Sequence, residues 1–140
     1  MKKAILIFFL AALGIVIYGY FKSVPPGQDN ENAPKIEITP ESYDFGDIKY
    51  GDIVNYAFEV KNSGKGVLEI KRVATSCACT TAQISKEKIN PGEKVLLEVR
   101  YDSGAMGLAH GKGKQERIIY IKSSDSNNPQ AEVVIYANIK

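Results

Sequence analysis

The chain has 140 residues, a formal net charge of +2 at neutral pH and a hydrophobic fraction of 44%. From Lys35 to Lys140 it carries 15 basic and 14 acidic residues in an interspersed pattern, so it has no basic stripe that could follow a phosphate backbone. This pattern argues against nucleic acid as a partner. The roughly 106 residues of this region suit one compact domain and leave no room for a second.

The N-terminal segment predicts a membrane anchor. Ala4 to Phe21 is a run of 18 residues without a charged side chain. At about 1.5 Å per residue it spans about 27 Å, close to the hydrocarbon thickness of a bilayer. The run ends in aromatic residues, which are typical of the membrane interface, rather than in the small residues of a signal-peptidase site. We therefore predict an uncleaved signal anchor in residues 1–22, with a cleaved signal peptide as the alternative.

The charges around this segment predict its orientation. Lys2 and Lys3 precede the apolar run and only Lys22 closely follows it, so the positive-inside rule keeps the N-terminus in the cytoplasm. Residues 23–35 are rich in Pro, Asn and acidic side chains and lack apolar periodicity, which is typical of a flexible linker. The sequence thus predicts a single-pass protein of the cell membrane. Its C-terminal domain, residues 36–140, is expected to be extracytoplasmic, either periplasmic or extracellular.

The C-terminal region shows the two-residue periodicity of β-strands. Residues 53–61 place Val54, Tyr56, Phe58 and Val60 on one face and polar side chains on the other. Gly, Pro, Asn and Ser separate this run from others like it, and no convincing amphipathic helix follows the N-terminal segment. The predicted strands cover residues 36–45, 53–61, 67–73, 80–85, 94–101, 116–122 and 131–139.

Seven short strands separated by turns predict an all-β, immunoglobulin-like sandwich. If successive strands reverse direction, the first, third and fifth connections lie at one pole of the sandwich. The third connection contains both cysteines of the chain. The fifth, residues 102–113, is rich in glycine and contains the only histidine. We therefore expect Cys77 and Cys79 to share a pole with this long loop.

The cysteine pair is the most distinctive chemical feature of the sequence. Together with Met106 and His110 of the long loop, Cys77 and Cys79 form a set of soft or borderline donors, which suits monovalent copper or, for two thiolates with a histidine, zinc. An oxidising envelope could instead hold the pair as a disulfide, provided that the Cα atoms lie within about 7 Å. In the third and leading interpretation, both side chains pack as small apolar groups at the end of the sandwich.

Motifs for catalysis are absent from the sequence. It has no Gly-x-Ser-x-Gly elbow, no phosphate-cradling loop that opens a helix and no His-Glu-x-x-His pair. We therefore expect neither an enzyme nor a resident cofactor. The leading expectation is a membrane-tethered binding module that contacts another envelope protein or a ligand through its loops or an exposed strand edge. A copper- or zinc-handling protein and a thiol redox protein are the alternatives.

Four short motifs, in this order and spacing, resemble a bacterial family. They are Asp44-Phe45-Gly46, Asn62-Ser63-Gly64, Cys77-Ala78-Cys79-Thr80 and Pro91-Gly92-Glu93. With the surrounding sequence from residue 36 to residue 139, they resemble the bacterial domain of unknown function family 1573. The resemblance implies an immunoglobulin-like sandwich related to the domains of cilia-associated and sperm-protein type, and it implies no reaction.

The chain departs from this family pattern at one position. Similar family members commonly carry Gly between the two cysteines, whereas this chain has Ala78, so a backbone conformation open only to glycine is not required there. The resemblance also implies structural roles for two neighbouring residues. We expect Phe45 to plug the sandwich and Gly46 to turn the chain into the next strand.

Overall fold

A computed structural model describes residues 32–107 and 111–140. The predicted anchor, residues 1–22, and most of the predicted linker, residues 23–35, lie outside the described residues. Within the described ranges, no helix is long and apolar enough to cross a membrane. The secondary structure of this part is all β, as predicted. Its strands are β1 (Ile36–Thr39), β2 (Ser42–Ile48), β3 (Ile53–Asn62), β4 (Leu68–Thr75), β5 (Thr80–Ile84), β6 (Lys88–Ile89), β7 (Lys94–Asp102), β8 (Gly113–Ser123) and β9 (Gln130–Ile139).

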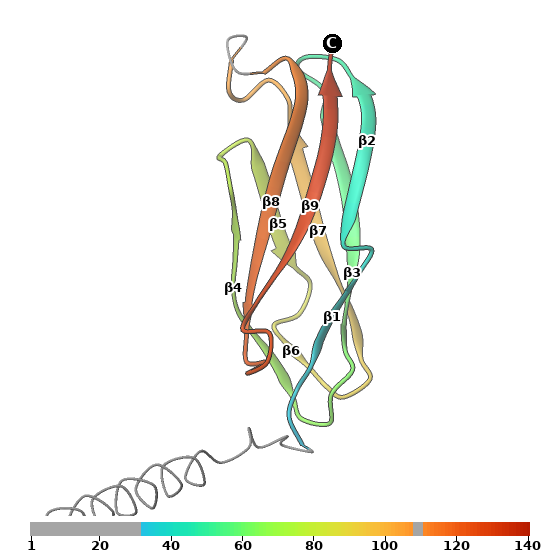
Figure 1. Cartoon of the computed structure of the whole chain (residues 1–140), viewed down its shortest axis with the longest axis vertical. Coiled ribbons are helices and arrows are strands. Elements are labelled where there is room, and N and C mark those ends of the chain that lie inside the picture. The colour runs from blue at the N-terminus through green and yellow to red at the C-terminus, as the bar shows by residue number, and fades with distance from the viewer. Residues whose placement is uncertain (1–31, 108–110) are drawn as a thin grey trace, which may run out of the picture. The chain divides into compact units, whose positions relative to one another are not determined.

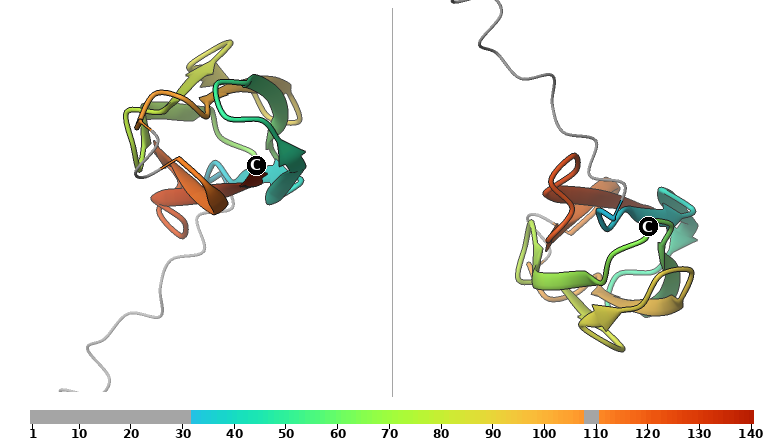
Figure 2. Two further views of the ribbon diagram at one scale, coloured as in Figure 1. Left: turned by 90° about the horizontal axis from the view of Figure 1, so that it is seen from above. Right: turned by 90° about the horizontal axis from the view of Figure 1, so that it is seen from below.

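The strands form two sheets that pack face to face (Figure 1). One sheet has the order β1-β3-β7-β5, and the other has the order β2-β9-β8-β4-β6. Every neighbouring pair is antiparallel except β2 and β9, which run parallel. Views along the strands show the two sheets as opposite walls of the domain (Figure 2). This arrangement is the predicted sandwich.

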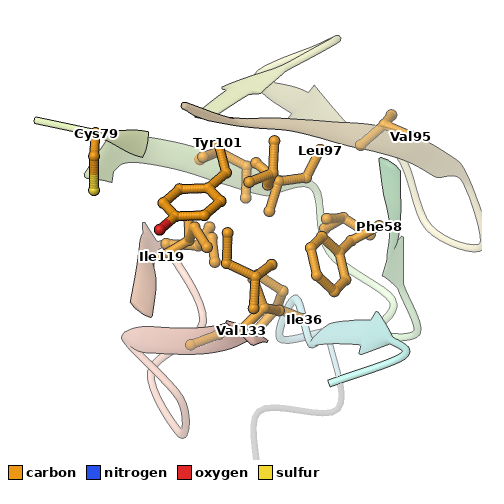
Figure 3. Close-up of a cluster of buried hydrophobic side chains, with 14 of the residues drawn as sticks. Ile36, Phe58, Cys79, Val95, Leu97, Tyr101, Ile119 and Val133 are labelled. Atoms are coloured by element: carbon orange, nitrogen blue, oxygen red, sulfur yellow. The ribbon is translucent and has the colours of Figure 1, made fainter. Parts of the chain in front are cut away.

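The core lies between the sheets and follows the predicted alternation. In β7, the inward residues Val95, Leu97, Val99 and Tyr101 are all buried. In β3, Phe58 and Val60 are fully buried, and β8 and β9 add inward residues such as Ile119 and Val133 (Figure 3). Because side chains of a strand point alternately to opposite faces, each strand can bury one apolar row while its polar row faces solvent. The two-residue pattern thus accounts for the core.

The first predicted strand, residues 36–45, is divided between the two sheets. Its first part, β1, pairs with β3 as far as Thr39, and its second part, β2, pairs with β9 from Ser42 onward. Pro40 lies at the switch, and proline cannot donate a hydrogen bond to a sheet. This division and the two-residue strand β6 explain why the described residues form nine strands rather than about seven.

Gly46 and Phe45 have roles that differ from those expected. Gly46 has a φ of +67° and lies at a register shift between Asp44 and Asp47, so it makes a bulge within β2 instead of turning the chain into the next strand. The turn that follows contains Gly51, with a φ of +90°. Phe45 is half-buried at the margin of the core, with its ring edge-to-face to Tyr43 at 5.0 Å, and does not plug the sandwich.

The two long sides of the sandwich differ. On one side the chain passes from β1 in one sheet to β2 in the other, beside a groove of about 330 Å³ lined by residues 36–39 of β1, Glu41, Asn128, and residues 131 and 132 of β9. On the other side, β4 and β5 lie in different sheets and do not pair with each other (Figure 1). Between them runs a groove of about 210 Å³, lined by residues 70–73 of β4, 82–84 of β5 and Glu87. β5 is consequently an edge strand beside an open groove.

Three connections meet at one end of the sandwich, as the alternation of strand direction predicted. We call this end the cysteine pole and define it as the described parts of loops 49–52, 76–79 and 103–112. Ser103 Oγ lies 2.9 Å from both the Lys49 and the Asp52 carbonyl oxygens. The Asp102 amide donates to the Cys79 carbonyl oxygen at 2.9 Å. These bonds join the three connections.

Candidate functional site

A disulfide joins Cys77 and Cys79, and their Cα atoms are 5.3 Å apart. The loop is short because β4 ends at Thr75 and β5 begins at Thr80. Thr75 Oγ1 lies 3.0 Å from the Cys77 carbonyl oxygen and 2.9 Å from the Thr80 carbonyl oxygen, and the Thr80 amide donates to the Cys77 carbonyl at 3.3 Å. The loop therefore has hydrogen bonds that hold its shape in addition to the disulfide.

Ala78 adopts an ordinary backbone conformation within this loop. In the described ranges, positive φ values occur only at glycines. Ala78 is therefore accommodated in the loop without backbone strain. Sequence reasoning had left an i, i+2 disulfide open as one of three alternatives, and the Cα separation satisfies its geometric condition.

The two sulfur atoms have different environments. Cys79 is only 3% exposed and belongs to the margin of the hydrophobic core (Figure 3). Cys77 is half-buried and packs against that core from outside. Thr80 Oγ1 lies within 3.5 Å of the Cys77 sulfur and 3.7 Å of the Cys79 sulfur. A reagent from solvent therefore reaches Cys77 more easily than Cys79.

Arg117 of β8 completes the site. Its Nε donates to Cys79 Sγ at 3.1 Å. Its two terminal nitrogens donate to Gln115 Oε1 at 2.6 Å and to the Glu116 carbonyl oxygen at 2.7 Å, and the guanidinium carbon lies 5.8 Å from the centre of the Tyr101 ring. These contacts hold a positive charge beside the buried sulfur.

The Tyr101 ring that faces the Arg117 guanidinium is an uncharged phenol. Burial raises the pKa of Tyr101 above its ordinary value, while the Arg117 charge acts in the opposite direction. The phenol therefore stays protonated at neutral pH and offers its π face to the guanidinium.

Sequence reasoning did not identify Arg117, although one signal was present. In β8 the buried side chains Ile119 and Ile121 are two residues apart, and the same alternation carries Arg117 to the core side of the strand. A charged residue at an inward position needs a partner. The identity of that partner, 38 residues earlier in the chain, could not be found without the topology.

The four predicted metal ligands are only partly accounted for. The structure brings Cys77 and Cys79 together, Met106 lies 44% exposed in the long loop of the same pole, and His110 lies outside the described residues. Within ranges 32–107 and 111–140, no group of three or more His, Cys, Asp and Glu residues is arranged to hold a metal. A copper or zinc site at these four residues stays a prediction, and it requires the reduced cysteine pair because thiolates are the ligands.

Comparison with known families gives one match that spans the domain. The family model described as "Protein of unknown function (DUF1573)" matches residues 36–139, a range that contains every described strand. None of the curated proteins matches the sequence.

Solved structures share the fold. A protein of unknown function from Porphyromonas gingivalis W83 is 25% identical, with a TM-score of 0.70, over 82% of this chain and 51% of its own. The chain thus spans about half the length of that protein. PapD-like domain 7 of human CEP192 is 10% identical, with a TM-score of 0.58, over 84% of this chain and 93% of its own. The VesB protease of Vibrio cholerae is 17% identical, with a TM-score of 0.58, over 76% of this chain and 32% of its own. At such identities the last two show a fold likeness alone, and the PapD-like neighbour agrees with an immunoglobulin-like sandwich.

Proposed function

Because the chain belongs to the DUF1573 family, whose function is unknown, we propose its function from the geometry of the domain and from the sequence of the N-terminal segment. It is a non-enzymatic, membrane-tethered and extracytoplasmic binding module. It pairs with an extended segment of another envelope protein along the edge of β5. The observation that carries this proposal is the open side of the sandwich, where β5 has no neighbouring strand beyond β7.

The hydrogen bonds of β5 show which backbone groups point to this open side. Cys79 and Ser85 bond to Asp102 and Leu96 of the β7 segment, respectively. In an antiparallel ladder, residues that bond to the partner alternate with residues whose N–H and C=O point away from it. Ala82 and Ile84 therefore direct their backbone groups toward the groove, where they can pair with an added strand.

The other sheet edges carry features that hinder such pairing, and β5 does not. β6 has two residues and includes Lys88, β2 is interrupted by the bulge at Gly46, and β1 has four residues and includes Glu37. Short strands, charges and bulges are the usual protection of edge strands. β5 reads Thr-Thr-Ala-Gln-Ile, without charge or proline. Its unprotected edge supports a role in recognition.

The groove beside β5 indicates the kind of ligand. Ile70, Val73 and Ile84 contribute to its lining, with Lys71, Arg72 and Glu87 around them. A strand added at this edge points every second side chain toward the groove. We therefore expect an extended segment with apolar residues at alternate positions, and main-chain hydrogen bonds as its principal attachment.

Substitution of Ala82 tests this edge directly. Ala82→Pro removes an N–H that points away from β7 and so spares the β5–β7 ladder, whereas the control Ala82→Val keeps that N–H. A photo-reactive amino acid is placed at position 83, and the protein is irradiated in cell membranes. We expect it to cross-link to an extended segment of one envelope protein. Ala82→Pro loses one backbone hydrogen bond to the partner, so its cross-linking yield should fall about fivefold. The yield of Ala82→Val should equal that of the parent protein. Equal cross-linking yields in the two variants, when urea titration shows that both are folded, contradict the proposal.

The membrane tether has its own test. If residues 1–22 anchor the chain, the full-length protein stays with the membrane pellet after an alkaline wash, and protease added outside the cytoplasmic membrane digests the domain. Release into the soluble fraction would instead favour the cleaved signal peptide. Protection from the protease would contradict the extracytoplasmic location.

A further inference from the structure

We propose that the Cys77–Cys79 disulfide is a thiol–disulfide exchange site that accepts two electrons from a protein dithiol in the cell envelope. The proposal rests on three observations: the two cysteines differ in exposure, Arg117 contacts only the sulfur of the buried one in the described structure, and the loop has hydrogen bonds of its own. It does not depend on the edge of β5 and so goes beyond the binding function, but the envelope location of its substrate rests on the proposed membrane tether.

The first step follows from the difference in exposure. A thiolate of the dithiol substrate attacks Cys77 Sγ, because Cys77 is the more exposed residue of the pair. A bond forms between the substrate sulfur and Cys77, the Cys77–Cys79 bond breaks, and its electron pair leaves on Cys79 as a thiolate. Exchange is faster when the leaving thiolate is better stabilised. The Arg117 guanidinium lies where this negative charge appears, 3.1 Å from Cys79 Sγ.

The second step completes the electron balance. The other thiolate of the substrate attacks the substrate sulfur in the mixed disulfide, and Cys77 leaves as a thiolate. The substrate is oxidised to a disulfide, and the cysteine pair is reduced to two thiols after taking up protons from solvent. Each domain oxidises one dithiol, so the reaction is stoichiometric and needs no further reactant.

Arg117 is positioned before the reaction begins. Its contacts with Gln115, the Glu116 carbonyl and the Tyr101 ring hold the guanidinium in place without help from a thiolate. A charge-assisted hydrogen bond in a partly dry site is stronger than the same bond in water. Arg117 therefore stabilises the reduced pair more than the disulfide, which makes the disulfide the stronger oxidant.

A purely structural role explains the disulfide less well. Cross-links stabilise a fold chiefly by restricting the unfolded chain, and the effect is least for the shortest loops. This disulfide closes a loop of only three residues, which Thr75 and the Thr80 amide already hold by hydrogen bonds. Reduction should therefore leave the sandwich folded, as exchange requires.

The redox equilibrium of the full-length protein in detergent tests the role of Arg117. The reduced fraction is measured in glutathione buffers of known ratio. Arg117→Gln should lower the equilibrium constant for reduction about tenfold, equivalent to a potential about 30 mV more negative. Arg117→Lys, which keeps the charge, should recover part of this loss. The control Arg100→Gln removes an exposed arginine of β7 and should change nothing. An Arg117→Gln equilibrium within twofold of wild type overturns the proposal.

Trapping of the mixed disulfide tests which sulfur is attacked and does not rely on Arg117 variants. Cys79→Ser leaves Cys77 as a single thiol, and Cys77→Ser leaves Cys79. Each is incubated with oxidised glutathione, and the adduct is measured by mass spectrometry. At alkaline pH, which ionises both thiols, Cys79→Ser should form its adduct about tenfold faster because Cys77 is the more exposed residue. Equal rates, or faster trapping at Cys79 in folded protein, contradict attack at Cys77. Loss of the folded circular dichroism spectrum on reduction of wild type would assign the disulfide a structural role instead.

Discussion

The two poles of the sandwich are held together by different chemistry. At the pole opposite the cysteines, which we call the Asn62 pole, the side chain of Asn62 is fully buried. Its Nδ2 donates to the Gly66 and Ile89 carbonyl oxygens at 2.7 and 2.9 Å, and its Oδ1 accepts from the Gly64 and Lys35 amides at 3.0 and 3.3 Å. Every hydrogen-bonding group of this amide is used.

A second buried side chain strengthens the Asn62 pole. Asp125 is 2% exposed and accepts hydrogen bonds from the Ile36, Asn127 and Asn128 amides at 3.0, 2.9 and 3.1 Å. The cysteine pole instead has a disulfide between one buried and one partly buried cysteine, and an arginine that contacts the buried sulfur. A network whose hydrogen bonds are all made specifies one geometry, whereas a disulfide beside a positive charge can change its oxidation state. Under the proposed exchange reaction, the contrast separates residues that define the fold from residues that react.

The largest effect is expected at the Asn62 pole. Asn62→Ala removes four hydrogen bonds and leaves one buried and three partly buried backbone groups without this partner, so we expect the free energy of unfolding to fall by about 3 kcal/mol. Urea titration measures the change. Asn55→Ala, at an exposed position of the same strand, is the matched control and should change stability by less than about 0.5 kcal/mol. A loss below about 1 kcal/mol for Asn62→Ala would show that water replaces the network easily.

A smaller effect is expected at the cysteine pole. The double variant Cys77→Ala with Cys79→Ala removes a cross-link that closes only three residues, so the free energy of unfolding should fall by about 1.5 kcal/mol on the chain-entropy account. The same urea titration measures it, with reduced wild type as the companion sample. A loss larger than that of Asn62→Ala would reverse the comparison and make the disulfide the main structural element of the domain.

These poles also show how far the sequence alone could predict the molecule. The alternation in β3 and β7 and the reversal of successive strands correctly predicted the core rows and the grouping of three connections, because both are local or topological rules. The division of the first strand had one visible sign, Pro40, whose missing N–H interrupts a ladder. The contact of Arg117 with Cys79 and the burial of Asn62 depend on residues far apart in the chain. Such contacts have no signature in a single sequence.

At the Asn62 pole, the chain joins the domain before the predicted end of the linker at residue 35. The Ala33 carbonyl accepts from the Lys65 and Gly66 amides at 3.1 and 3.4 Å, and the Lys35 carbonyl accepts from Ser63 at 2.9 Å. These residues belong to the stretch 23–35 that the sequence assigned to a linker. Regular pairing of the chain with the domain therefore begins before β1, in residues without any apolar pattern from which it could have been predicted.

The smallest expected effect concerns the pH dependence of the Asn62 pole. Glu93 accepts from Lys86 Nζ at 2.6 Å and from the Asn90 amide at 2.8 Å, and these hydrogen bonds, that of Lys86 first, lower its pKa below the ordinary value. A carboxyl whose folded pKa is lowered stabilises the fold above its unfolded pKa, near 4.5, and this stabilisation is lost as the pH falls through the folded pKa.

Stability measured by urea titration should therefore decrease more steeply below about pH 5 in wild type than in Glu93→Gln, which cannot titrate at this position. Glu98→Gln, which removes an exposed carboxyl from the outward face of β7, is the matched control variant. Amide hydrogen exchange locates the effect. The Gly92 amide donates to the Asn62 carbonyl and reports on the Asn62 pole, and the Asp102 amide donates to the Cys79 carbonyl and reports on the cysteine pole. Acid should expose the Gly92 amide first. If acid exposes both amides together, Glu93 stabilises the whole sandwich and not the Asn62 pole alone, and the two poles unfold as one unit.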